Sequence, residues 1–294
     1  MQRQPSMPAT PTIAIVTGAS RGAGRGIAIA LGMHGCTVYV TGRSRQAGDH
    51  RLPGTILETA EAVTAAGGRG IAVGCDHGDD EQVSALFEQV MVEQGRLDIL
   101  VNNAAAIQDE LTQPGEFWEK PLRLDRIIDV GLRSGYVASW HAAPIMVARN
   151  RGLIVFTSSS GAAHYCMGPA YGAQKAGLGK MAFDMAVDFR HAGAKVSALA
   201  IWMGPLLTER LKSMIADDPA KYGHMEGHCE SPEFTGHIIW ALYTDPELTK
   251  LSGQTVVGAE IARKYGLTDD GRVPPTIQEL YGVSPAQFHP AEIR

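Results

Sequence analysis

Short apolar runs alternate with stretches of helical periodicity over most of the chain. The apolar runs cover residues 12–17, 37–41, 70–75, 97–101, 153–157, 195–201 and 253–257. Because they lack polar alternation, these runs are typical of strands buried on both faces of a sheet. Helical patterns lie between them, at residues 27–31, 57–66, 79–94, 125–147 and 170–191. We expect Gly131 and Gly135 to interrupt the long helix at residues 125–147. Strands separated by single helices predict an α/β fold with one doubly wound parallel sheet of about seven strands and helices on both faces.

The same pattern sets the expected domain boundaries. We assign residues 12–265 to a single domain that holds the whole sheet. The Pro-rich residues 1–11 are expected to form a flexible leader, and residues 266–294 a C-terminal extension that packs on the domain or on a neighbouring subunit. Residues 206–235 follow the sixth run, and loops over a rigid sheet commonly set specificity. We therefore expect them to form a substrate lid.

Composition narrows the class of protein. The net charge of −5 comes without a basic block, which argues against a nucleic-acid partner. No run of about 18 apolar residues is present, so no membrane span is expected. The four cysteines are scattered, without metal-binding spacing, and we expect reduced thiols in a cytoplasmic protein. His224 and His228 lack a partner carboxylate motif and are expected to be polar lid residues, so no metal site is predicted.

The first strand leads into a glycine turn, Gly18-Ala-Ser20-Arg21-Gly22-Ala-Gly24, and then into a helix. Glycines allow a tight turn and close backbone approach, and a helix N-terminus offers free N–H groups to a pyrophosphate. The first gap is one residue longer than in the common dinucleotide motif, and a turn without a ligand is the alternative. We predict that this turn binds the pyrophosphate of a dinucleotide.

The end of the second strand indicates which dinucleotide. An acidic residue there would hold the adenosine ribose of NAD, but the chain has Gly42 followed by Arg43. Arg43 and Arg21 could clamp a 2′-phosphate by charge-assisted hydrogen bonds, whereas the alternative is two solvated surface arginines. We therefore predict NADP(H) rather than NAD(H). Asp76, at the end of the third strand, is placed to accept from the adenine amino group.

A second group of candidate residues lies in the fifth helical pattern, residues 170–191. Tyr171 and Lys175 are four residues apart, so on a helix they project from one face. A cation beside a phenol stabilises the phenolate and lowers the tyrosine pKa below its free value of about 10. Such a tyrosine can exchange protons near neutral pH. An isolated pair at this spacing can also be a plain helix-face contact.

Three motifs in the same order resemble a classical short-chain dehydrogenase/reductase (SDR) over about residues 12–260. They are the turn that ends at Gly24, the run Asn102-Asn103-Ala104, and Tyr171-x3-Lys175. Residues 117–119, 130–133, 152–155 and 262–272 resemble, more narrowly, the subgroup called dehydrogenase/reductase SDR family member 1. The resemblance implies a single Rossmann-type domain and an oxidoreductase that moves hydride between a nicotinamide cofactor and a carbonyl or secondary alcohol. It also implies a homodimer or homotetramer formed through two long helices.

The resemblance assigns roles to individual residues. Tyr171 is the acid/base, Lys175 lowers its pKa and binds the ribose of the cofactor, and Ser159 polarises the carbonyl. Motifs and resemblance together predict these cofactor-binding residues: Gly18, Ser20, Arg21, Gly22, Gly24, Arg43, Asp76, His77, Asn103, Ala104, Tyr171, Lys175, Gly204 and Thr208. Gly204 is expected to offer its backbone to the carboxamide, and Thr208 its hydroxyl to a phosphate.

Two positions leave alternatives open, and a third departs from the family pattern. The usual family spacing to the tyrosine favours Ser158, whereas strand register favours Ser159, which we prefer. Asp129 stands where the family has an Asn that extends the proton relay to the lysine. It either serves the relay with a charge beside Lys175 or is purely structural. Met203 replaces a family proline before Gly204.

The residues expected near the cleft predict the substrate class. The lid and residues 164–167 are rich in Leu, Met, Tyr and His, which favours a medium-sized, fairly apolar carbonyl compound. The alternative function is a cofactor-binding regulatory protein with weak catalysis on the same fold, motivated by Asp129 and Met203. An epimerase or dehydratase acting on a nucleotide sugar is disfavoured, because those enzymes usually need a longer substrate domain and only about 30 residues follow the predicted domain.

Overall fold

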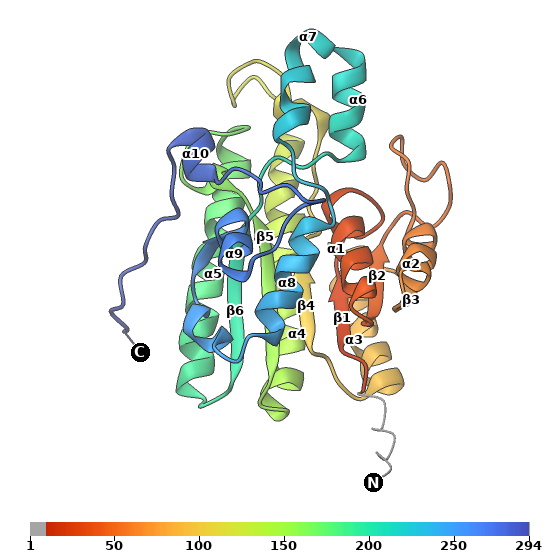
Figure 1. The fold of residues 1–294 in the computed structure, drawn as a ribbon, viewed down its shortest axis with the longest axis vertical. Coiled ribbons are helices and arrows are strands. Elements are labelled where there is room, and N and C mark those ends of the chain that lie inside the picture. The colour runs from red at the N-terminus through yellow and green to blue at the C-terminus, as the bar shows by residue number, and fades with distance from the viewer. Residues whose placement is uncertain (1–9, 294) are drawn as a thin grey trace.

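The computed structural model describes residues 10–293, so residues 1–9 of the predicted leader lie outside it. Its strands are β1 Ile13–Val16, β2 Thr37–Gly42, β3 Arg69–Gly74, β4 Ile99–Asn102, β5 Gly152–Ser158, β6 Val196–Trp202 and β7 Thr255–Val257. They form one parallel sheet in the order β3-β2-β1-β4-β5-β6-β7 (Figure 1). The predicted doubly wound sheet is confirmed. The strand order reverses between β1 and β4, and ligands of such sheets bind outside the carboxyl strand ends at this point.

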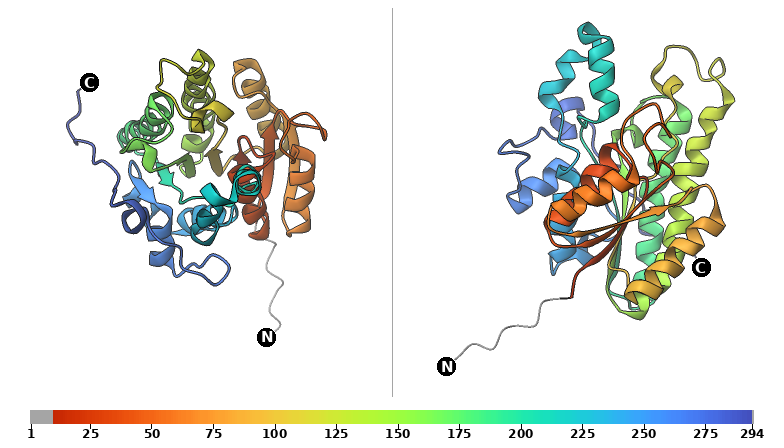
Figure 2. Two further views of the ribbon diagram at one scale, coloured as in Figure 1. Left: turned by 90° about the horizontal axis from the view of Figure 1, so that it is seen from above. Right: turned by 90° about the vertical axis from the view of Figure 1, so that its right-hand side faces the viewer.

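Helices cover both faces of the sheet (Figure 2). The α-helices are α1 Gly22–Met33, α2 Ile56–Ala65, α3 Asp80–Gln94, α4 Ser134–Ala148, α5 Pro169–His191, α6 Glu209–Asp217, α7 Pro219–Tyr222, α8 Phe234–Thr244, α9 Gly258–Tyr265 and α10 Ile277–Tyr281. Val16 and Val40 pack in one core cluster with residues of α1, α2, α8 and α9. Ile15 and Tyr39 pack in a second large core cluster, with residues of α3, α4 and α5. Alternate strand residues thus serve opposite faces, as the continuous apolar runs predict.

The helix predicted at residues 125–147 is shorter and begins later. A 3₁₀ turn, η2 Leu122–Asp125, is followed by a wide turn, η3 Ile128–Arg133, and only then by α4. Val130 and Gly131 have non-helical backbone angles, and Gly131 has a φ of 155°. Val130 O accepts from Ala106 N at 2.7 Å, so the break is held by the loop after β4. The interruption expected at Gly131 is found there, but α4 begins only after it, because a contact distant in sequence bends the chain at the glycine.

The remaining short segments are 3₁₀ turns: η1 Asp109–Thr112, η4 Ser160–Ala162, η5 Gly223–His228 and η6 Leu248–Leu251. Most of the predicted lid forms α6, α7 and η5, which stand above the carboxyl edge of the sheet (Figure 1). The C-terminal extension returns to the domain, where the Phe288 ring lies 5.3 Å from that of Phe183 on α5. No helix among residues 10–293 combines the length and apolarity needed to cross a membrane.

Candidate active site

Two chain segments bring a serine and a tyrosine together at the carboxyl edge of the sheet. Strand β5 is buried along its whole length and ends next to Ser159. Helix α5 begins with Pro169 at its first position, which places Tyr171 in the first turn. The Ser159 Oγ lies 2.9 Å from the Tyr171 hydroxyl, a normal hydrogen-bond distance between hydroxyls. Tyr171 is only 8% exposed and packs against Leu111 and Leu124.

The neighbouring Ser158 points elsewhere. It is fully buried, and its Oγ donates to the backbone oxygen of Lys175 at 3.1 Å. Strand alternation turns successive side chains to opposite faces, so only one of the two serines can face the tyrosine. The structure brings Ser159, the residue that strand register favours, to the Tyr171 hydroxyl.

Lys175 lies one helical turn after Tyr171 and is 7% exposed. Its ammonium donates to Thr157 O at 3.1 Å and lies 5.4 Å from the centre of the Tyr171 ring. Because a backbone carbonyl of β5 holds the ammonium, the lysine has a fixed position beside the serine and tyrosine.

Burial shifts the pKa values of this pair in opposite directions. Burial raises the pKa of Tyr171 to about 12, although the hydrogen bond from Ser159 opposes the shift. Burial also lowers the pKa of Lys175 to about 8. Lys175 is not among the groups that shift the pKa of Tyr171, so the expected lowering of the tyrosine pKa by the lysine stays a prediction. Desolvation disfavours both the phenolate and the ammonium, and the ammonium is directed at Thr157 O rather than at the phenol.

The structure does not place a carboxylate beside Lys175. Asp129 is exposed and lines an outer hollow with Asp80 and Arg133. Burial and Cys166 shift the pKa of Lys175, and Asp129 is not among the groups that act on it. The relay role of Asp129 stays a prediction that this placement does not support.

A buried amide lies at the break before α4. Gln174, which precedes Lys175 on α5, is 1% exposed. A Cβ added to Gly131 would lie 3.2 Å from its Nε2, so the Gln174 side chain fills the space that the glycine leaves. Its Oε1 has no protein partner. Sequence reasoning missed Gln174, because the contact joins elements more than 40 residues apart.

The glycine turn fits tightly against the end of β4. Gly18 has a φ of 63°, and a Cβ there would lie 2.7 Å from the Cα of Ala104. A Cβ on Gly24 would lie 2.4 Å from the Nδ2 of Asn103. Asn103 Nδ2 donates to Thr17 O at 2.9 Å and to Gly18 O at 3.1 Å. The predicted Asn-Ala pair thus ties the turn to the sheet, and the glycines are required sterically.

The N-terminus of α1 already binds an anionic side chain of the protein. Gly22 N donates to the carboxylate Oε2 of Glu209 at 2.8 Å. Thr208 lies at the same point, with its Cγ2 3.6 Å from where a Cβ on Gly22 would be. A carboxylate oxygen on this N–H shows that the turn suits an anionic oxygen such as that of a pyrophosphate. Its residues therefore fit a dinucleotide cofactor.

At the adenosine end, the two predicted arginines have different surroundings. The Arg43 side chain is 64% exposed and lies 3.7 Å from Asp76. Arg21 donates to Ser44 Oγ at 3.0 Å, to Pro53 O at 3.0 Å and to Gly54 O at 2.7 Å. The Arg21 donors thus hold the loop after β2, and Arg43 is the cation that remains open to a ligand.

Two further predicted cofactor residues have buried side chains. Ser20 is buried in the turn, and His77 lies 2.7 Å from the Oγ1 of Thr41 through its Nε2. Burial lowers the pKa of His77 to about 4, so the imidazole is neutral at pH 7. The cofactor-binding roles of Ser20 and His77 stay predictions.

The loop after β6 holds a buried carboxyl group. Gly204 N donates to Glu230 Oε2 at 3.1 Å, so the backbone N–H expected to meet the carboxamide has a protein partner. Glu230 is 2% exposed, and burial raises its pKa to about 7. Sequence reasoning missed Glu230, which lies in the lid without a local motif.

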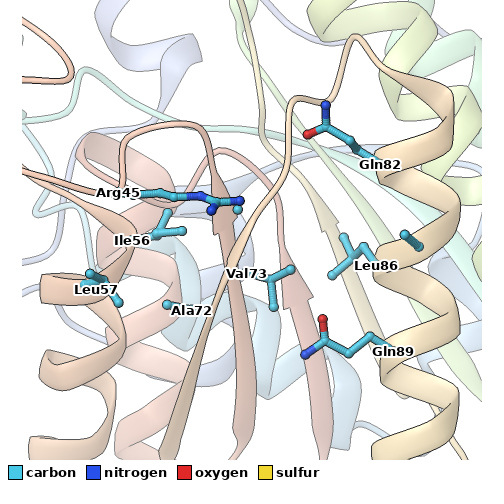
Figure 3. A pocket seen from close by; sticks show the side chains of 10 residues that line it. Arg45, Ile56, Leu57, Ala72, Val73, Gln82, Leu86 and Gln89 are labelled. Atoms are coloured by element: carbon cyan, nitrogen blue, oxygen red, sulfur yellow. The ribbon is translucent and has the colours of Figure 1, made fainter.

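The hollow in Figure 3 lies away from these groups. It covers the edge strand β3 between α2 and α3, and Arg45, Val73, Leu86 and Gln89 line it. Neither Ser159 nor Tyr171 is among its lining residues. A smaller apolar cavity of about 170 Å³ lies at the start of α5, where Leu111, Tyr165 and Ala170 contribute to its wall.

A doubly wound sheet with a dinucleotide turn and a Ser–Tyr–Lys group at its carboxyl edge defines a nucleotide-dependent α/β oxidoreductase. The family model for short chain dehydrogenases matches residues 12–219. The chain belongs to the SDR family, in the subgroup of dehydrogenase/reductase SDR family member 1. Membership implies a nicotinamide cofactor. Among residues 10–293, no cluster of three or more His, Cys, Asp or Glu side chains could hold a metal.

Curated relatives and solved structures agree with this assignment. The chain is 42% identical over 272 residues to "Dehydrogenase/reductase SDR family member 1" of Mus musculus, covering 88% of this chain and 84% of the relative. Identity to the Homo sapiens protein of that name is 40% over 294 residues, covering 96% and 90%. A putative dehydrogenase from Xanthomonas campestris superposes with a TM-score of 0.75 at 28% identity, covering 90% of this chain and 94% of that structure.

Proposed function

We propose that the chain is an NADP(H)-dependent carbonyl reductase or alcohol dehydrogenase. The observation that carries this proposal is the 2.9 Å contact between Ser159 and Tyr171 with the buried Lys175 ammonium one turn away. A hydrogen-bond donor, a proton donor and a cation at one point suit a carbonyl oxygen that gains negative charge. The nicotinamide cofactor, when bound, supplies the hydride in reduction and accepts it in oxidation.

Tyr171 is the proton donor for reduction. With a pKa of about 12 it is protonated at neutral pH, and it can give its proton to the carbonyl oxygen while Ser159 donates a second hydrogen bond. The phenolate that remains is stabilised by the Lys175 ammonium. Because the pKa of Lys175 is about 8, we expect the reduction rate to fall as pH rises above about 8 and the cation is lost.

Arg43 is the basis of the preference for NADP(H). It is a largely exposed cation beyond the end of β2, and Gly42 before it offers no carboxylate to the ribose of NAD. The glycine turn, Asn103 and Ala104 would hold the pyrophosphate region, with Thr208 above the turn. Asp76 lies beside Arg43, where it could meet the adenine.

The substrate class follows from the apolar surroundings of Tyr171. Leu111 and Leu124 pack on its ring and also line the cavity at the start of α5. An apolar wall next to one polar reacting group favours a medium-sized carbonyl compound with an apolar body. Residues 206–235 act as the lid that closes over it.

Assembly through α4 is part of the proposal. Tyr136, Trp140 and Val147 are exposed on this helix, with Trp140 63% exposed. A large exposed aromatic patch on a helix is typical of a protein interface. We propose a cytoplasmic homodimer or homotetramer that uses this face. Size-exclusion chromatography with light scattering should show an oligomer that Trp140→Glu dissociates, and a monomeric wild-type protein would contradict it.

The direct experiment is NADPH oxidation across ketones, aldehydes and quinones, with NADH in parallel. We expect turnover of apolar carbonyl compounds with NADPH preferred. Tight NADPH binding without turnover of any compound would favour the second candidate, a cofactor-binding regulatory protein. The observation behind that candidate is the contact between Gly204 and Glu230, which removes a backbone donor from the expected cofactor face.

A further inference from the structure

We infer that Glu209 is an internal anion that latches the lid onto the glycine turn, and that the pyrophosphate of the cofactor displaces it on binding. This inference rests on the proposed cofactor site and concerns how that site is regulated.

The contact is at the start of α1, a helix of 12 residues. The first N–H groups of a helix have no partner within it and carry a partial positive charge. The N-cap residue Arg21 makes no side-chain cap, and the first turn of α1 holds no acidic residue. The Glu209 carboxylate, 187 residues further along the chain, supplies the anion at 2.8 Å. It therefore satisfies a donor that α1 leaves open.

The same contact fastens the lid. Glu209 is the first residue of α6, and Thr208 caps that helix through a 3.4 Å bond from Leu211 N. On the other side, Arg210 binds Asp109 Oδ1 at 2.6 Å and Ile107 O at 3.2 Å. The start of the lid is thus held between the glycine turn after β1 and the loop after β4. These two segments flank the point where the strand order reverses, where a dinucleotide would enter.

A carboxylate oxygen and a phosphate oxygen compete for the same N–H group. Both are anions that accept charge-assisted hydrogen bonds, so they repel each other and cannot share one donor. Binding of the pyrophosphate therefore requires Glu209 to leave the turn, and it releases one of the two fastenings of α6. Cofactor binding and lid opening are coupled through this single side chain.

The test compares two ligands in matched variants. NADP⁺ carries the pyrophosphate, whereas adenosine 2′-monophosphate carries only the phosphate expected at Arg43. We expect Glu209→Gln to lower the Kd for NADP⁺ about tenfold, or about 1.4 kcal/mol, because the competing charge is removed. Its Kd for adenosine 2′-monophosphate should stay unchanged. Glu209→Asp keeps the charge but shortens its reach, and should also tighten NADP⁺ binding.

Glu226→Gln is the control, because it removes an exposed lid carboxylate that makes no contact with the turn. It should bind both ligands as the wild-type protein does. Equal NADP⁺ affinity in Glu209→Gln and wild type would overturn the latch, and so would equal tightening for both ligands, which indicates a long-range charge effect. If no variant and no wild-type protein binds NADP⁺, the cofactor proposal itself fails. Melting temperatures establish that each variant is folded.

Discussion

The carboxyl edge of the sheet and the lid above it are held in place by different forces. Strand β5, which leads to Ser159, is buried throughout and hydrogen-bonded to β4 and β6 along its length. In α6 only Leu211 is buried, and the helix is anchored by the charged contacts of Glu209 and Arg210. Apolar packing fixes one region, whereas exchangeable polar contacts fix the other.

This difference separates two tasks. Groups that must meet a reacting atom within a few tenths of an ångström belong on rigid elements. Groups that must yield to an incoming ligand can be held by hydrogen bonds that the ligand replaces. Mutations near β5 should therefore change rate or stability, whereas mutations of the polar contacts that hold the lid should change binding.

Among variants of the β5 end and of the lid, the largest effect should come from the serines at the end of β5. Ser159→Ala removes a hydrogen-bond donor from the reacting oxygen, and we expect kcat to fall about 100- to 1,000-fold. Ser158→Ala loses only the bond to Lys175 O, which should lower stability by about 1 kcal/mol and leave kcat near wild type. Steady-state kinetics and urea denaturation measure both. The opposite ranking would return the active role to Ser158.

Lys175→Met should stabilise the protein while it reduces activity. The folded-state pKa of about 8 lies below the ordinary 10.5, so the buried ammonium costs stability below pH 8. At about 1.4 kcal/mol per pH unit the cost is up to about 3 kcal/mol at pH 7. Removing the amine should give that gain at pH 7, and the gain should vanish as pH rises from about 8 to 10.5. A gain that does not depend on pH would show that burial of the charge is not its cause.

Glycines in the two regions should respond differently to alanine. Gly24→Ala places a Cβ 2.5 Å from Gly18 O, and relieving this overlap should cost about 2 kcal/mol and abolish NADPH binding. Gly223 in the lid has no atom within 4 Å of an added Cβ, so Gly223→Ala should leave melting temperature and NADPH affinity unchanged. Equal responses at the two sites would contradict the contrast between packed turn and open lid.

The smallest effect should be at Arg43. Because this side chain is mostly exposed, we expect Arg43→Ala to raise the KM for NADPH only about tenfold and to leave that for NADH unchanged. Arg45→Ala is the matched control, since Arg45 lies across Gly74 on the edge strand β3 (Figure 3). An unchanged KM for NADPH in Arg43→Ala, with NADH still poorly used, would refute the assignment of the 2′-phosphate site.

Local patterns explain which of these features could be predicted from the sequence. The apolar runs predicted every strand of the sheet, because a strand buried on both faces has a continuous local signature. Register also predicted that Ser159 rather than Ser158 would meet Tyr171. The glycine itself marked an interruption at Gly131, but the bond between Val130 and Ala106 that holds the break joins residues that no local pattern connects.

Burial and nonlocal carboxylates explain most of what the sequence did not predict. The pKa of Tyr171 depends on how deeply its ring is packed, which the spacing to Lys175 does not reveal. Glu209 and Glu230 act on backbone N–H groups of other elements, and each has an ordinary sequence context. For Glu209, the only local indication of a role near the cofactor was its position next to Thr208, a predicted cofactor-binding residue.

The most direct test of the proposed chemistry follows hydride and proton together. NADPH deuterated at nicotinamide C4 is supplied with a ketone that the wild-type enzyme reduces, and deuterium in the alcohol is measured by mass spectrometry. Wild type should transfer deuterium to the carbonyl carbon, and Tyr171→Phe should do so about 100- to 10,000-fold more slowly, because it lacks the proton donor. Tyr265→Phe, which alters a tyrosine on α9 whose hydroxyl donates to Asp245, should match wild type. Transfer at the wild-type rate by Tyr171→Phe would contradict the account.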